Sequence, residues 1–144
     1  MTDKPKQEYT VAVQVSSESV HALITGAIEY GSGYWVRFIH EIAPSPEHVR
    51  RCEDGLRIPS PMCEGGAYIF RDGEASYAIG DAQHGDTDEN HTPLRLDLES
   101  IRRGLKAMAD KHPRHFGDVV SGRDDSITAD VFLQCCLLGD IFYG

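Results

Sequence analysis

Basic residues and long apolar runs are both scarce in this chain of 144 residues. Lysine and arginine number 14 against 23 aspartates and glutamates, so the formal net charge is −9. Nucleic acids and anionic membranes both attract lysine and arginine, so this balance argues against either partner. The longest apolar stretch, residues 131–144, is interrupted by Gln134 and Asp140. It is too short to span a bilayer, which needs about 20 apolar residues.

Targeting signals and cysteine frameworks are also missing. The first ten residues, MTDKPKQEYT, lack the apolar core of a signal or transit peptide. We therefore expect a cytoplasmic protein, in which cysteines are more often free than bridged. Cys52 and Cys63 have no second ligand pair at a zinc-binding spacing, and the adjacent Cys135 and Cys136 indicate small core residues.

No recognised catalytic or phosphate-binding motif is present. Ser60 and Cys63 lack the context of a serine hydrolase, a papain-like protease or a caspase. The glycine pairs in GSGYW and GGAY lack the spacing and the Lys-Ser/Thr of a phosphate-binding loop. The acidic pair Asp124 and Asp125 is better explained as a helix entry than as an acid/base pair. These absences favour a non-enzymatic protein without a cofactor.

What is present is the composition of one globular domain, with 40% hydrophobic and 26% charged residues. We expect residues 1–144 to form a single α+β domain. Its small, mostly antiparallel sheet should be packed by three to four helices, including a buried C-terminal helix.

Three segments have the composition of strands. Tyr9 to Val15 alternates apolar and polar residues, as a half-buried strand does. Tyr34 to Ile42 is rich in aromatic and β-branched residues, and its Trp35 is the expected core anchor. Tyr68 to Arg71 and Ala75 to Ile79 should form a hairpin around Asp72-Gly73. A further short strand is expected just before Asp97.

The expected helices follow from cap residues and apolar spacing. The first starts at Ser16 or Ser17 and stops at Gly31, and the second is capped by Asp97 and ended by Pro113. Pro113 starts a short third helix. The last begins with Ser126 or Thr128 as its cap and breaks at Gly139, and residues 141–144 should tuck into the core or a dimer interface. Between strand and hairpin, residues 43–66 form a long connection with one helical turn after Ser45.

The segment GDAQHGDTDENH, residues 80–91, gathers acids and histidines without a basic residue. Asp86, Asp88 and Asn90 match the first ligands of a calcium-binding EF-hand loop, but His91 stands where that loop turns on glycine. A transition metal would need His84, His91 and a nearby carboxylate, or the pair His112 and His115, to converge rigidly. Both arguments disfavour a metal site, which leaves a solvated loop or a surface for a partner.

Three segments, GSGYWV, HPRHFGD and GRDDSITADVFLQCCLLGDIFYG, resemble a set of small uncharacterised proteins encoded by bacteriophages and prophages. Those proteins tend to end in DVFLQ, an apolar pair, Gly, an acid, an aliphatic residue, a bulky residue and Tyr-Gly. The resemblance covers the aromatic strand and roughly the last 40 residues, and does not extend to the middle loop region. It implies a bacterial cytoplasm, where small acidic phage proteins often act by binding, including inhibitors of host defence complexes. It implies no catalytic residue.

The first functional hypothesis is a non-enzymatic binding protein. Its acidic residues Asp81, Asp86, Asp88 and Glu89 would engage a basic surface of a host protein or protein complex and block it sterically. The acids of the long connection, Glu53, Asp54 and Glu64, would extend this surface.

Two other hypotheses remain open. A small enzyme or small-molecule binder would close loops 43–66 and 80–93 over a pocket lined by His40, His84, Cys63 or Tyr34. A structural phage component or a homodimer is the third.

Overall fold

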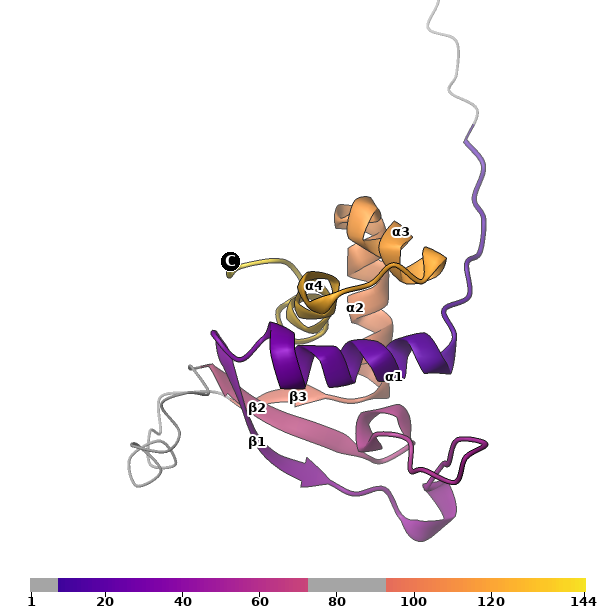
Figure 1. The fold of residues 1–144 in the computed structure, drawn as a ribbon, viewed down its shortest axis with the longest axis vertical. Helices are drawn as coiled ribbons and strands as arrows, with labels where there is room; N and C mark the ends of the chain where they lie inside the picture. Colours follow the sequence, from indigo (N-terminus) through magenta and orange to yellow (C-terminus); the bar gives the residue numbers. More distant parts are fainter. Residues whose placement is uncertain (1–7, 73–92) are drawn as a thin grey trace, which may run out of the picture.

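The computed structural model describes residues 8–72 and 93–144 and shows the expected α+β arrangement (Figure 1). An antiparallel sheet in the order β1-β2-β3 is formed by β1 (Val36–Ile42), β2 (Ala67–Asp72) and β3 (Leu94–Leu96). The helices are α1 (Ser17–Gly26), α2 (Leu98–Lys111), α3 (Pro113–Ser121) and α4 (Ser126–Leu138). All four lie on one side of the sheet (Figure 1).

The register of the sheet separates an apolar face from a polar one. Phe38 is opposite Phe70, and Phe70 is opposite Leu94 on the other side. Directly paired residues of antiparallel strands point to the same face, so these side chains share the face that packs on the helices. Arg37 is opposite Arg71 on the other face.

Helix α4 is the centre of the helical layer. All nine residues from Thr128 to Cys136 are buried, as the nearly uninterrupted apolar sequence predicted. It approaches α2 closely because Gly104 of α2 has no side chain at the contact, where a Cβ would collide with Cys136. The helix breaks at Gly139, which has a left-handed conformation with φ of 83°.

The starts of three of the four helices were predicted correctly, two of them by their cap residue and the third by its first residue. Ser16 accepts a hydrogen bond from the Ser19 amide at 3.1 Å, Asp97 forms a capping box with Ser100, and Pro113 is the first residue of α3. For α4 the expectation of Ser126 or Thr128 was wrong. The cap is Asp125, whose carboxylate accepts from the Thr128 amide at 2.9 Å. A charged acceptor next to the helix N-terminus outcompetes the neighbouring hydroxyls.

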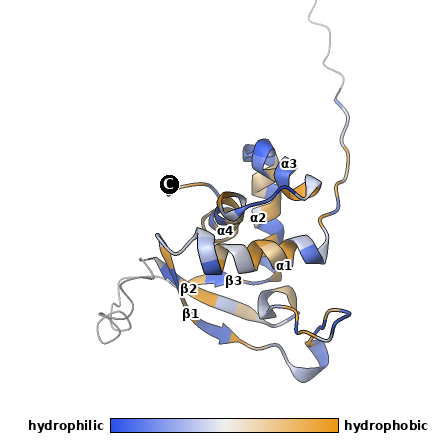
Figure 2. Cartoon of the chain, viewed as in Figure 1, coloured by the Kyte–Doolittle hydropathy of each residue, from blue (hydrophilic) through white to orange (hydrophobic). Residues whose placement is uncertain are grey.

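The expected strand at Tyr9 to Val15 is not formed. Residues 8–15 run as an extended segment from the start of α1 away from the sheet and past α3 (Figure 1), and Val11 is 77% exposed. The valines at 11, 13 and 15 instead line a shallow hollow with Leu105 and Phe116. Figure 2 shows hydrophobic residues along this segment, outside the main body. Alternation of apolar and polar residues indicates that an extended segment has one apolar face. It does not show that the segment pairs with a strand, because such a face can also lie against helices.

The structure tests part of what was expected for the long connection and for the hairpin. The long connection contains two short 3₁₀ turns, Pro46–His48 after Ser45 as expected and Ser60–Met62. The second strand of the hairpin, Ala75 to Ile79, lies outside the described residues. Within them, Tyr68 to Phe70 pairs with β1 on one side and β3 on the other. In the described ranges, 8–72 and 93–144, no helix has the length and apolar character needed to cross a membrane.

Candidate functional site

A buried carboxylate is the centre of the first candidate site. Asp130 is 8% exposed in the middle of α4. Its Oδ1 accepts hydrogen bonds from Ser32 Oγ at 2.8 Å and Trp35 Nε1 at 2.7 Å. Its Oδ2 accepts from Tyr34 Oη at 2.6 Å and Gln134 Nε2 at 3.1 Å. Four neutral donors thus satisfy one buried negative charge, which would otherwise be costly.

The turn after α1 positions three of these donors. A π-helical turn, Ala27–Gly31, ends where the Ser32 amide donates to the Ala27 carbonyl at 2.8 Å. The amides of Trp35 and Val36 then donate to the Ser32 carbonyl, both at 3.1 Å, which folds the turn tightly against α4. Gly31 permits this approach, because a Cβ there would collide with the Ser126 carbonyl oxygen.

Gln134 links the same site to the C-terminal residues. Its Oε1 accepts the amides of Phe142 at 2.8 Å and Tyr143 at 2.9 Å, and its Nε2 donates to the Tyr143 carbonyl at 3.2 Å. The Tyr143 ring stacks on Trp35 with ring centroids 5.1 Å apart. Residues 141–144 were expected to tuck into the core or a dimer interface. Ile141 packs against the core, whereas Tyr143 stacks on Trp35 but stays 38% exposed and Phe142 is 68% exposed.

A hollow of about 430 Å³ opens beside Asp130. Tyr30, Tyr34, Ile127 and His115 are among its lining residues. The Nδ1 atom of His115 is buried and has no hydrogen-bond partner. Burial, together with the hydrogen bond to Asp130, raises the pKa of Tyr34 to about 12, so its phenol stays protonated at neutral pH.

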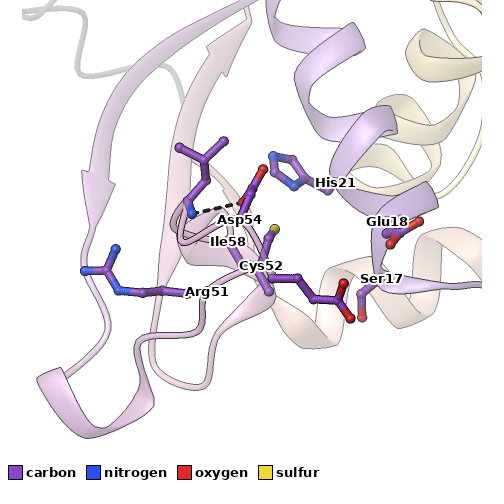
Figure 3. Close-up of a pocket in the computed structure, with 9 residues that line it drawn as sticks. Ser17, Glu18, His21, Arg51, Cys52, Asp54 and Ile58 are labelled. Carbon is purple, nitrogen blue, oxygen red and sulfur yellow. Dashed lines mark hydrogen bonds between the residues drawn. The ribbon is translucent and has the colours of Figure 1, made fainter.

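A second hollow, of about 600 Å³, lies between α1 and the connection at residues 51–58. Figure 3 shows the His21 ring of α1 pointing toward the loop that carries Cys52 and Asp54, while the Arg51 side chain extends away from α1. Glu18, one turn earlier in α1, lines the same hollow. Glu53 also lines this hollow. Three carboxylates, from Glu18, Glu53 and Asp54, thus surround one surface depression, which we call the acidic hollow.

A small turn presents two of these acids. The Cys52 amide donates to the Leu56 carbonyl at 2.8 Å, and the Gly55 amide donates to the Cys52 carbonyl at 2.9 Å. Gly55 has φ of 87°, a conformation that glycine adopts without strain. Asp54 Oδ1 accepts the Leu56 amide at 3.1 Å and stabilises the turn. The result is an exposed tip carrying Glu53 and Asp54.

The predicted site residues are distributed as follows. The acids Asp81, Asp86, Asp88 and Glu89, and the histidines His84 and His91, lie outside the described residues. Glu53 and Asp54 are together at the acidic hollow, whereas Glu64 is separate, with a carboxylate oxygen 3.6 Å from His48 Nε2.

The residues named for the predicted small-molecule pocket are not found together, and His84 with most of loop 80–93 lies outside the described residues. Cys63 is buried, His40 is exposed on the polar face of the sheet, and Tyr34 lies at the hollow beside Asp130. His112 Nε2 is 2.7 Å from Asp140 Oδ1. Over residues 8–72 and 93–144, no three histidine, cysteine or acidic side chains are grouped closely enough to hold a metal ion.

Sequence reasoning missed Asp130 and Gln134. The available signal was a charged residue and an amide four positions apart within an otherwise apolar helix, because residues at that spacing share one face. Their partners lie about a hundred residues earlier in the chain, in GSGYWV, and only folding joins the two segments.

The fold and the two hollows define a small α+β protein with an acidic surface depression and a separate buried carboxylate. Comparison with known proteins found no matching family model, no matching curated protein and no matching solved structure.

Proposed function

We propose that this protein is a non-enzymatic accessory protein of a phage or prophage that binds a host protein through an acidic surface. The observation that carries the proposal is the acidic hollow, where Glu18 of α1 meets Glu53 and Asp54 of the long connection. The host partner would present a basic surface. A nucleic-acid-handling defence complex in the bacterial cytoplasm has such a surface, and occupying it would inhibit the complex sterically.

The charges of the acidic hollow are available to a partner. Glu18 and Glu53 are exposed, and neither forms a hydrogen bond or ion pair within the described part of the chain. Exposed charges of one sign steer a partner of opposite charge and raise its association rate. Leu56 lines the same hollow and is 64% exposed, which adds apolar contact at the centre of the charged rim.

The acids Asp81, Asp86, Asp88 and Glu89 belong to the same proposal. With Glu53 and Asp54 they account for much of the negative charge in the middle third of the sequence. We propose that they extend the binding surface and take part in the same encounter with a basic partner.

The test is affinity capture from host lysate with an N-terminal tag, followed by kinetics on the purified target. One variant carries Glu18→Gln, Glu53→Gln and Asp54→Asn, and a second carries Asp81, Asp86, Asp88 and Glu89→Ala. The asparagine at 54 keeps an oxygen that can accept the Leu56 amide. A matched control carries Glu29→Gln, Glu99→Gln and Asp110→Asn, which changes the net charge equally at exposed positions outside the acidic hollow.

The proposal predicts slower association and a weaker salt dependence for the first two variants, with the control close to wild type. If all variants capture the same target with the same rates at low and high salt, acidic binding is wrong. If wild-type protein captures no target, the binding function itself is overturned.

A further inference from the structure

The carboxylate of Asp130 is buried without a cation. Its four hydrogen-bond donors, from serine, tyrosine, tryptophan and glutamine, are all neutral. Among residues 8–72 and 93–144, no lysine or arginine lines the hollow beside it. Buried charges in proteins are usually paired, so a negative charge next to an open hollow of about 430 Å³ favours a cationic ligand.

Two further polar atoms that line the hollow, on Tyr34 and His115, can accept hydrogen bonds from a ligand. Tyr34 donates its only hydroxyl proton to Asp130, and its oxygen accepts one hydrogen bond, from Gln134 Nε2 at 3.4 Å, so a second acceptor position remains for a ligand. His115 Nδ1 is buried without a partner and accepts in the neutral tautomer protonated on Nε2. The hollow therefore offers two acceptors beside the carboxylate, and a ligand with several N–H donors would satisfy them together.

The walls suit a cation with a short apolar body. Tyr30, Tyr34 and Tyr143 contribute aromatic rings, whose faces attract cations, while Ile127 and Val131 contribute aliphatic surface. Volumes of this size hold small molecules.

We propose that the hollow beside Asp130 binds the primary ammonium group of a small alkylamine. An ammonium is favoured over a guanidinium because each Asp130 oxygen already accepts two hydrogen bonds, which obstructs the paired contacts of a guanidinium fork. The ammonium is a compact charge whose attraction to the carboxylate does not require two vacant acceptor positions side by side. Tyr34 and His115, which line the same hollow, are the groups that would accept its protons.

Trp35 makes this proposal measurable. It is the only tryptophan of the chain, and its indole donates directly to Asp130. Butylammonium chloride titrated into the protein at constant ionic strength should change the Trp35 fluorescence saturably. Butan-1-ol, which has the same body without the charge, and butylguanidinium should each bind at least about tenfold more weakly, since a hydrogen bond to a charged group contributes about 1.5 to 3 kcal/mol.

Three variants test whether butylammonium binds at the hollow beside Asp130 or changes the fluorescence through a general effect of salt. Asp130→Asn removes the charge and should weaken butylammonium binding about tenfold or more. Because this change disturbs a buried network, Ile127→Lys and Ile127→Met provide a pair at a position that is 63% exposed. The lysine places a tethered ammonium at the hollow and should abolish binding, whereas methionine should leave it nearly unchanged.

A second arm identifies the source of the ammonium group. Binding of butylammonium but not of N-acetyl-lysine methylamide supports a free small amine, and binding of the lysine compound alone overturns that assignment. Equal responses to butylammonium and butan-1-ol, or equal binding by the two Ile127 variants, overturn the ammonium site. The Glu18/Glu53/Asp54 variant should bind butylammonium normally, so failure here is distinct from failure of the acidic hollow.

Discussion

Trp35 and Tyr143 stack with ring centroids 5.1 Å apart and planes inclined by 13°. The contact joins the turn after α1 to the last residues of the chain. Gln134 lies beneath the C-terminal residues and holds their backbone with three hydrogen bonds. The final segment is therefore part of the folded body and not an appended tail.

Deletion of residues 141–144 should destabilise the protein. The deletion removes the stack on Trp35 and leaves the buried amide of Gln134 without its backbone partners. An unsatisfied buried polar group costs about 1 to 3 kcal/mol, and the lost aromatic contact adds to that. Thermal denaturation should show a lower Tm, and a truncated protein with unchanged Tm and solubility would contradict the docking of this segment.

Gly104→Ala should destabilise the contact of α2 with α4. A Cβ at this position would lie 2.7 Å from the Cα of Cys136, so the two helices must separate. Overpacking of this kind costs about 1 to 3 kcal/mol.

Gly117→Ala is the matched control, because nothing lies within 4 Å of a Cβ there and the residue is helical. Alanine should leave the free energy of unfolding unchanged or raise it by up to about 1 kcal/mol. Urea denaturation of both variants checks the pair. Equal effects at the two positions would exclude the close helix contact as the cause.

Asp125 should contribute stability that depends on pH. The backbone amide of Thr128, followed by its hydroxyl, lowers the pKa of the Asp125 carboxyl in the folded protein. A lowered folded pKa means that this contribution is present above the unfolded pKa and is lost as the pH falls through the folded pKa. Asparagine also caps helices but does not titrate.

The comparison is therefore between wild type and Asp125→Asn. Wild type should be the more stable protein near neutral pH, and the difference should shrink as the pH falls below the unfolded-state pKa of aspartate, about 3.9. Urea denaturation across this range measures it. A difference that is constant with pH would show that the carboxylate charge is not involved.

The four cysteines should differ in reactivity towards a thiol reagent. Cys52 is half-buried, while Cys63, Cys135 and Cys136 are buried. Burial raises the pKa of Cys135 to about 11 and that of Cys136 well above its usual value, so both stay as unreactive thiols at neutral pH. Native protein should label rapidly at one site and denatured protein at four. Loss of the rapid phase in Cys52→Ser assigns it, and rapid labelling of Cys136 in native protein would contradict the packing of α4.

Capping residues predicted the helix boundaries well, because a cap forms its hydrogen bonds within one turn of the helix end and can therefore be recognised from the neighbouring residues. Ser16, Asp97, Pro113 and Gly139 each mark a boundary that the structure confirms. At α4 the candidates Asp125, Ser126 and Thr128 are neighbours, and all three can accept a hydrogen bond. Sequence reasoning therefore found the place of this boundary but not the residue that caps it.

The extended segment at residues 8–15 shows that an alternating apolar pattern does not by itself predict a strand. Its alternation correctly indicates one apolar face, but alternation does not specify the covering surface. Within the described chain this face lines an open hollow with Leu105 and Phe116, and its Val11 and Val13 stay largely exposed instead of packing in a sheet.

The sequence by itself determined the α+β class, the order of the helices and most helix boundaries, because these follow from composition, apolar period and interactions within a few residues. Only the tertiary structure decided the two candidate sites. Asp130 bonds to Ser32, Tyr34 and Trp35, and Glu18 lines one hollow with Glu53 and Asp54, across separations that no local pattern encodes. Those contacts depend on how the helices pack on the sheet, which is set by the whole core at once.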